Sequence, residues 1–143
     1  MDDMLETMYQ APGIGLAAIQ IGIPKRIIVL DISKDPEKKE PLYFVNPEKV
    51  YTSEDQATYE EGCLSVPGQF AEIDRPDKCH IKYLDYNADS KELKADGLLA
   101  TCIQHEMDHL EGILFIDYLS KLKRSMITKK LSKQKKELER IVV

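Results

Sequence analysis

The sequence is poor in the features that mark secreted, membrane-spanning or nucleic-acid-binding proteins. Only three of its 143 residues are cysteines, and their spacing does not form a disulfide framework, so a reducing cytoplasm is the expected location. No apolar run approaches the roughly 18 residues of a membrane span, and the acidic residues 1–4 lack the apolar core of a secretion signal. The formal net charge of −5 gives no reason to expect nucleic acid as the main partner. We therefore expect a cytoplasmic protein that binds neither membranes nor DNA.

What the sequence does contain is the composition of a globular domain. Hydrophobic residues make up 43% of it and charged residues 31%, which is typical of a soluble globular protein. A chain of 143 residues can bury a core without disulfides. Neither an internal repeat nor a linker interrupts it. We therefore expect a single domain over residues 1–143.

The pattern of hydrophobic residues predicts an α+β fold. Helical spacing predicts a helix near residues 1–9 and a central helix over 97–110, which Asp96 caps and Gly112 ends. Residues 13–18 are expected to form a compact loop. The mostly antiparallel sheet is expected to pack around the central helix, with a lysine-rich helix at the C-terminal end. The strands are predicted near residues 26–32, 42–45, 48–51, 56–59, 70–73, 80–85 and 91–95, and the last helix at 117–141.

The central helix carries a metal-binding pattern. His105 and His109 are four residues apart, so their imidazoles lie on one helical face and can bind the same ion. Glu106 lies at the edge of that face, where a carboxylate can move protons on a metal-bound water. A single helical histidine is usually structural, but this pair with the intervening glutamate predicts a hydrolytic metal site.

The helix alone does not decide the third ligand. Catalytic sites of the zinc type usually hold three protein ligands and leave a position for water. Cys63 is the sharpest candidate, because it lies in a tight loop between Gly62 and Pro67 and a thiolate binds borderline divalent ions well. A lone loop cysteine, however, is more often buried and inert. The other candidates are His80, Glu111 and Asp117.

Three segments together resemble the signature of the peptide deformylases. They are residues 13–20 (GIGLAAIQ), 61–65 (EGCLS) and 104–109 (QHEMDH), and the resemblance covers essentially the whole chain. It implies Cys63, His105 and His109 as ligands of one divalent ion, Fe2+ first, with Zn2+, Ni2+ or Co2+ as alternatives. It also implies a hydrolase that removes the formyl group from the N-terminal formylmethionine of nascent polypeptides and releases formate.

The resemblance further implies a role for each residue around the metal. Glu106 accepts and returns a proton, while the side-chain amide of Gln20 and the backbone N–H of Leu64 stabilise the negative oxygen of the transition state. Thr101 places a hydroxyl in the wall of the methionine pocket, which is expected to weaken methionine preference modestly unless it bonds to the carbonyl of Gly97. The residues implied in substrate binding are Gly13, Ile14, Gly15, Tyr59, Leu98, Thr101 and Cys102.

Two other functions fit the same residues. A general metallopeptidase of the His-Glu-x-x-His type would not need Cys63, so a Cys63→Ala variant separates it from a deformylase. Deformylases usually carry a further segment before the point where this sequence begins, which motivates a shortened paralogue that binds metal or peptide without turnover. The basic helix at 117–141 is either a solvated face or a surface attracted to ribosomal RNA.

Overall fold

The protein has the α+β architecture that its sequence predicts. The computed structural model describes residues 1–10, 13–33, 37–63 and 65–142, with side chains described as far as residue 135 except that of Pro67. That these residues form a single domain stays a prediction. In chain order the elements are α1 (Asp2–Gln10), β1 (Gly15–Ala17), the short 3-10 helix η1 (Ala18–Ile21), β2 (Ile27–Leu30), β3 (Leu42–Thr52), β4 (Gln56–Cys63), β5 (Val66–Pro76), β6 (Lys78–Leu84), β7 (Ser90–Asp96), α2 (Gly97–Leu110), the 3-10 helix η2 (Phe115–Tyr118) and α3 (Lys121–Val142).

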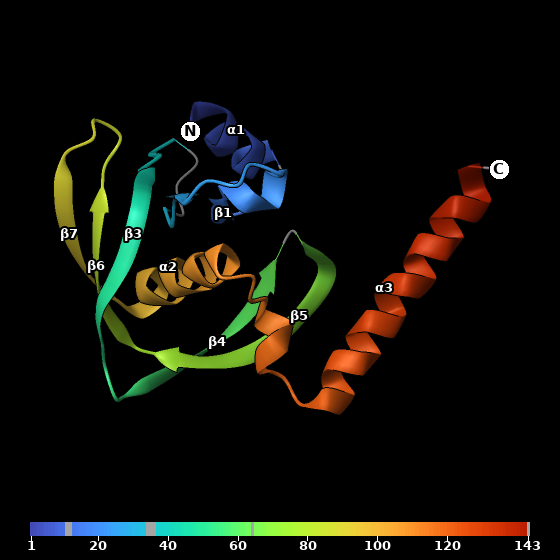
Figure 1. Ribbon diagram of the computed structural model, residues 1–143. Coiled ribbons are helices and arrows are strands. Elements are labelled where there is room, and N and C mark those ends of the chain that lie inside the picture. The colour runs from blue at the N-terminus through green and yellow to red at the C-terminus, as the bar shows by residue number, and fades with distance from the viewer. Residues whose placement is uncertain (11–12, 34–36, 64, 143) are drawn as a thin grey trace.

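The described strands form two antiparallel sheets. Five strands pair in the order β1-β2-β3-β6-β7, and β4 pairs with β5 in a separate two-stranded sheet. Helix α2 lies between the two sheets and contacts strands of both (Figure 1). The predicted central helix is therefore confirmed, and it packs against both sheets.

The continuous apolar run of β2 is explained by helices on both of its faces. Successive side chains of a strand point to opposite faces. Ile28 and Leu30 pack with the buried residues of α2, whereas Val29 packs with Met4 and Met8 of α1. All five side chains are buried. Helix α1 thus covers the β1 and β2 part of the sheet face that α2 leaves uncovered.

Two predictions about the strands were wrong in their bounds. Residues 42–45 and 48–51 belong to one strand, β3, which continues through Pro47 because the pairing with β6 shifts register between Val45 and Glu48. Proline lacks the N–H of a ladder hydrogen bond, so it is tolerated at such a bulge. The segment expected to be a loop contains β1, whose residue Leu16 pairs with Val29 of β2.

The ends of the helices also differ in detail from the prediction. Helix α2 begins at Gly97 as expected, but the side chain of Asp96 makes no capping hydrogen bond. Gly112, at φ 75°, follows its end. The predicted helix 117–141 is interrupted, because the chain is extended at Leu119 and α3 begins only after Ser120, whose hydroxyl accepts the N–H of Lys123 at 3.3 Å. Within the described residues no helix is both long and apolar enough to cross a membrane.

Candidate metal centre and active site

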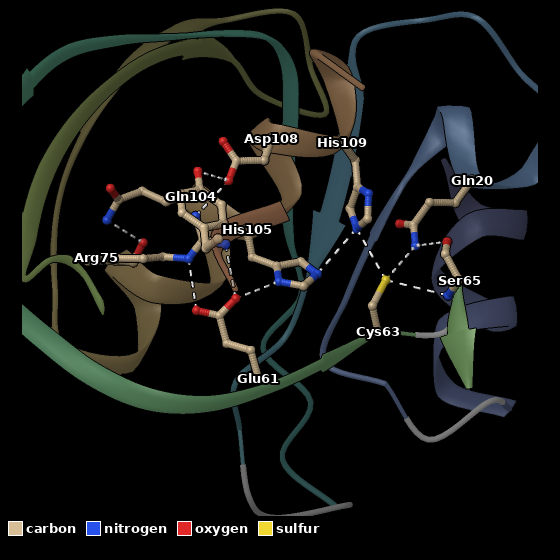
Figure 2. Close-up of polar contacts among 11 residues, drawn as sticks. Gln20, Glu61, Cys63, Ser65, Arg75, Gln104, His105, Asp108 and His109 are labelled. Carbon is tan, nitrogen blue, oxygen red and sulfur yellow. Dashed lines mark hydrogen bonds and ion pairs between the residues drawn. The ribbon is translucent and has the colours of Figure 1, made fainter. Parts of the chain in front are cut away.

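Three side chains from β4 and α2 converge on one point. Cys63 is the last residue of β4, and His105 and His109 lie one turn apart on α2. The Sγ of Cys63 is 3.2 Å from Nε2 of His109, which is in turn 3.2 Å from Nε2 of His105 (Figure 2). All three ligand atoms lie within 4.8 Å of one another. The structure therefore brings together the sulfur and the two imidazoles that the resemblance implied.

The donor set fits a divalent metal ion. One sulfur and two imidazole nitrogens suit Zn2+ and other borderline ions, and three protein ligands leave a position for water. Burial alone would raise the pKa of the Cys63 thiol, but hydrogen bonds from His105, His109 and the backbone of Ser65 outweigh it and lower the pKa to about 5. The thiolate is the form that binds metal. Cys63 is therefore ready to act as a ligand at neutral pH.

The surroundings of His105 also favour positive charge. Burial lowers its pKa, yet hydrogen bonds to Cys63 and Glu61 outweigh this and raise the pKa to about 10. A divalent cation competes with the proton for the same Nε2 lone pair. The negative groups that favour a proton there favour a metal ion for the same reason.

A buried network of charges holds His105 in this orientation. Its Nδ1 lies 2.8 Å from Oε1 of Glu61, and Arg75 donates to both oxygens of Glu61 at 2.8 and 3.0 Å. Arg75 also donates to Asp108 at 2.7 Å (Figure 2). Asp108 in turn accepts the hydroxyl of Tyr118 at 2.6 Å. A carboxylate on one ring nitrogen leaves the other nitrogen directed at the metal position. We call these residues the His105 support network.

Glu106 lies beside the metal position without a partner for one of its oxygens. Its carboxylate is buried, Oε2 makes no hydrogen bond among the described residues, and burial raises its pKa to about 7. The backbone of Gly15 passes so close that a Cβ there would lie 2.7 Å from Oε1 of Glu106. A carboxyl group with a pKa near neutrality can both accept and donate a proton at physiological pH.

Gln20 approaches the same position from η1. Its Oε1 accepts the N–H of Ala17 at 2.8 Å, which directs its Nε2 toward Sγ of Cys63 at 3.3 Å and Oγ of Ser65 at 3.1 Å (Figure 2). The amide group therefore points its donor toward the metal position. Leu64, whose N–H was implied as a second donor, lies outside the described residues.

A cavity of about 560 Å³ opens beside the metal position. His105 and Glu106 lie in its wall together with Cys63. Its lining includes all seven residues implied in substrate binding: Gly13, Ile14, Gly15, Tyr59, Leu98, Thr101 and Cys102. The hydroxyl of Thr101 does not bond to the carbonyl of Gly97 and has no partner among the described residues.

Sequence reasoning missed part of the site. Arg75 and Tyr118 were given no role, and neither were Glu61 and Asp108, although both lie in quoted segments. A signal for Glu61 existed, since it stands two residues before Cys63 in a strand and so shares its face. The cavity is also lined by Glu60, Val66, Gly68, Gln69 and Phe70, which were not predicted.

The other candidate ligands lie elsewhere. His80 is in β6, with its ring 4.6 Å from that of Tyr51. Glu111 pairs with Arg26 at 3.0 Å. Asp117 accepts the N–H of Leu114 at 2.9 Å. None of the three belongs to the Cys63, His105 and His109 group.

Comparison with known proteins agrees with this geometry. A family model described as polypeptide deformylase matches residues 1–125. The peptide deformylase of Pelagibacter ubique is 72% identical over all of this chain and 82% of its own length, and that of Phenylobacterium zucineum is 61% identical over 95% and 80%.

Solved structures of the same family share the fold. The peptide deformylase of Legionella pneumophila is 47% identical with a TM-score of 0.88, covering 97% of this chain and 80% of its own. The enzyme of Ehrlichia chaffeensis, solved in complex with actinonin, is 45% identical with a TM-score of 0.87, covering 93% and 80%. Sequence, fold and site agree, and the chain belongs to the polypeptide deformylase family of metal-dependent hydrolases.

Proposed function

We propose that this protein removes the formyl group from N-formylmethionyl peptides, releasing formate and a peptide with a free amino end. The observation that carries the proposal is the convergence of Cys63, His105 and His109, of which Cys63 and His105 line one cavity together with the buried carboxylate of Glu106. Hydrolysis of a formyl amide needs an activated water, a proton carrier and donors for the negative oxygen. The site offers a group for each.

Glu106 is the proton carrier of this proposal. A divalent ion bound at the three ligands would lower the pKa of water and polarise the formyl oxygen. Glu106 accepts the proton of the attacking water and returns it to the departing amine. Its buried position beside Gly15 keeps the carboxylate close to the reacting atoms.

Gln20 and the backbone of Leu64 are the proposed oxyanion donors. The hydrogen bond from Ala17 holds the Gln20 side chain in this orientation before substrate arrives. The role of the Leu64 N–H is supported by the family resemblance alone. Each donor of this kind can contribute roughly 3 kcal/mol to transition-state stabilisation.

The cavity is proposed to bind the methionine side chain and the start of the peptide. Leu98, Thr101 and Cys102 form its wall on α2, and Tyr59 lies in β4. The segment 13–15 is proposed to lie along the substrate backbone, since glycines let another chain approach closely. A formylated peptide would then lie as an added strand.

The metal is proposed to be Fe2+, with Zn2+, Ni2+ or Co2+ as alternatives. A site with one sulfur and two nitrogens accepts several of these ions, so cellular supply decides which is bound. The support for iron comes from the family resemblance. Metal analysis of protein purified under anaerobic conditions tests it: iron in near-equal molar amount supports the assignment, and zinc in its place contradicts it.

The activity is tested by formate release from formyl-Met-Ala-Ser with anaerobically purified protein. Glu106→Gln is expected to keep the metal and slow turnover by at least about 100-fold, because the proton carrier is lost. Cys63→Ala is expected to lose metal and activity, whereas the control Cys79→Ala, in the core away from the site, keeps both. A near-normal rate for Glu106→Gln would contradict the assigned role.

Metal content, peptide hydrolysis and formate release, measured on the same variants, separate the competing functions. A general metallopeptidase would retain its metal and peptide hydrolysis after Cys63→Ala. A paralogue that binds without turnover would take up metal and release no formate. A protein that releases formate only with Cys63 intact is a deformylase.

We further propose that α3 attracts the protein to ribosomes in the cytoplasm, where nascent chains are made. The helix packs against the cluster around Val66 through Ile127 and Leu131, and its C-terminal end projects away from the sheets (Figure 1). The basic side chains of its described part are exposed. Salt-dependent binding to ribosomes is expected to be lost in the triple variant Lys129→Glu, Lys130→Glu and Lys133→Glu, whose residues lie outside the apolar cluster around Val66. Unchanged binding would remove this proposal.

A further inference from the structure

The side-chain amide of Gln20 is held at both of its ends. At one end, its Oε1 accepts the N–H of Ala17 at 2.8 Å. A backbone N–H can only donate, so the oxygen of the amide must face Ala17 and the nitrogen must face the metal position. At the other end, Nε2 lies 3.1 Å from Oγ of Ser65 and 3.3 Å from Sγ of Cys63 (Figure 2). The bond to Ala17 already has a role in the proposed function, whereas the hydroxyl of Ser65 has none.

One hydrogen bond does not fix the direction of an amide group. The last torsion of a glutamine side chain has a broad energy profile, so the bond at Oε1 alone leaves the amide plane of Gln20 free to rotate. Its Nε2 carries two hydrogens. When one of them is bound to Oγ of Ser65, the plane is set and the second hydrogen takes a fixed direction. That second hydrogen faces Sγ of Cys63, one of the three ligand atoms around the metal position.

Ser65 also contacts the sulfur ligand through its backbone. Its N–H lies 3.4 Å from Sγ of Cys63, two residues earlier in the chain. Its hydroxyl reaches Gln20, which lies in η1, 45 positions earlier. The backbone of Ser65 is therefore tied to the ligand sulfur, and its side chain links η1 to the segment that follows Cys63.

We propose that Ser65 is a positioning residue whose hydroxyl accepts one N–H of Gln20 and so aims the other N–H at the oxygen that becomes negative in the transition state. The proposal rests on the function proposed above. A donor stabilises such an oxygen most when it is aimed before the reaction begins. In this proposal Ser65 acts through Gln20 and does not touch the reacting atoms. Loss of its hydroxyl should lower kcat while substrate binding and metal binding stay unchanged.

The first test measures formate release from formyl-Met-Ala-Ser by metal-loaded wild type and Ser65→Ala. The variant is expected to lower kcat about 3- to 10-fold, the effect of losing one hydrogen bond, with KM within about twofold. Ser65→Thr keeps the hydroxyl and should retain roughly half of the wild-type kcat or more. The control Ser53→Ala removes a hydroxyl that accepts the N–H of Lys78 at 3.1 Å, outside the cavity, and should leave kcat unchanged. An unchanged kcat in Ser65→Ala, a change in KM alone, or an equal loss in Ser65→Thr would overturn the proposal.

A double-mutant cycle tests whether Ser65 acts through Gln20. Gln20→Ala should lower kcat roughly 100-fold or more, because a donor to the negative oxygen is lost. If Ser65 only aims that donor, adding Ser65→Ala to Gln20→Ala should slow turnover by less than about twofold more. A further loss as large as that of Ser65→Ala alone would show that the two residues act independently, and it would overturn the proposal.

Metal affinity supplies a readout that does not depend on turnover. Ser65→Ala keeps Cys63 and the N–H of residue 65, so it should bind zinc as tightly as the wild type. Weaker zinc binding would show that Ser65 acts on the sulfur ligand instead and would overturn the proposal. A wild type that releases no formate would contradict the proposed function itself. An active wild type with an equally active Ser65→Ala removes only the role of Ser65.

Discussion

Arg75 is not a metal ligand, but its loss should strongly lower the free energy of unfolding of this protein. Its guanidinium donates to Glu61 at 2.8 and 3.0 Å and to Asp108 at 2.7 Å. The side chains of these carboxylates are 5% and 10% exposed. Replacing Arg75 by methionine would leave the buried carboxylate of Asp108 without its cation and that of Glu61 with His105 alone. Breaking a buried ion pair from one side typically costs about 3–5 kcal/mol, and we expect Arg75→Met to reach that range.

A matched control exists on the surface. Arg26 pairs with Glu111 at 3.0 Å, but these side chains are 45% and 63% exposed. Exposed pairs contribute about 0–1 kcal/mol, so Arg26→Met should change the free energy of unfolding by no more than that. The two variants make the same chemical change in opposite surroundings.

The assay is urea unfolding followed by circular dichroism, since the sequence has no tryptophan for fluorescence. Extrapolation to zero urea gives the free energy of unfolding for each protein. Arg75→Met should also bind metal about 10- to 100-fold more weakly, because Glu61 no longer holds His105 in place. A loss below about 1 kcal/mol for Arg75→Met, equal to that of Arg26→Met, would refute the argument.

Two further predictions concern the same site. Gly15→Ala should keep the metal but lower kcat roughly 10- to 100-fold. The new Cβ would lie 2.7 Å from Oε1 of Glu106 and would displace that carboxylate. An unchanged kcat would contradict this prediction. Although burial alone would raise it, hydrogen bonds from His105 and Arg75 lower the pKa of Glu61 in the folded state. Glu61 therefore adds stability that is present above the ordinary carboxyl pKa and is lost as the pH falls through the lowered one. In metal-free protein, the unfolding free energy of the wild type should fall more steeply below pH 4.5 than that of Glu61→Gln; parallel curves would contradict this.

The parts of the fold and site that could be predicted depend on local patterns. The spacing of His105 and His109 predicts one helical face because both lie in the same regular element. The apolar run of β2 predicts a buried strand for the same reason. The resemblance supplied Cys63, which the sequence around it had left among several candidate ligands.

The parts that were missed depend on contacts between distant residues. Arg75 reaches Asp108 across 33 positions of sequence, and no periodicity marks either residue as a partner. The continuation of β3 through Pro47 depends on a register shift against β6, which local composition does not contain. The unpaired hydroxyl of Thr101 is visible only when its neighbours are placed.

The measurement that tests this account most directly is X-ray absorption spectroscopy of the zinc-loaded protein. Convergence of Cys63, His105 and His109 on one ion predicts one sulfur at about 2.3 Å and two imidazole nitrogens at about 2.0–2.1 Å from zinc. The sulfur should disappear in Cys63→Ala if that variant is loaded with excess metal. A wild-type spectrum with no sulfur bound to the zinc would contradict the account.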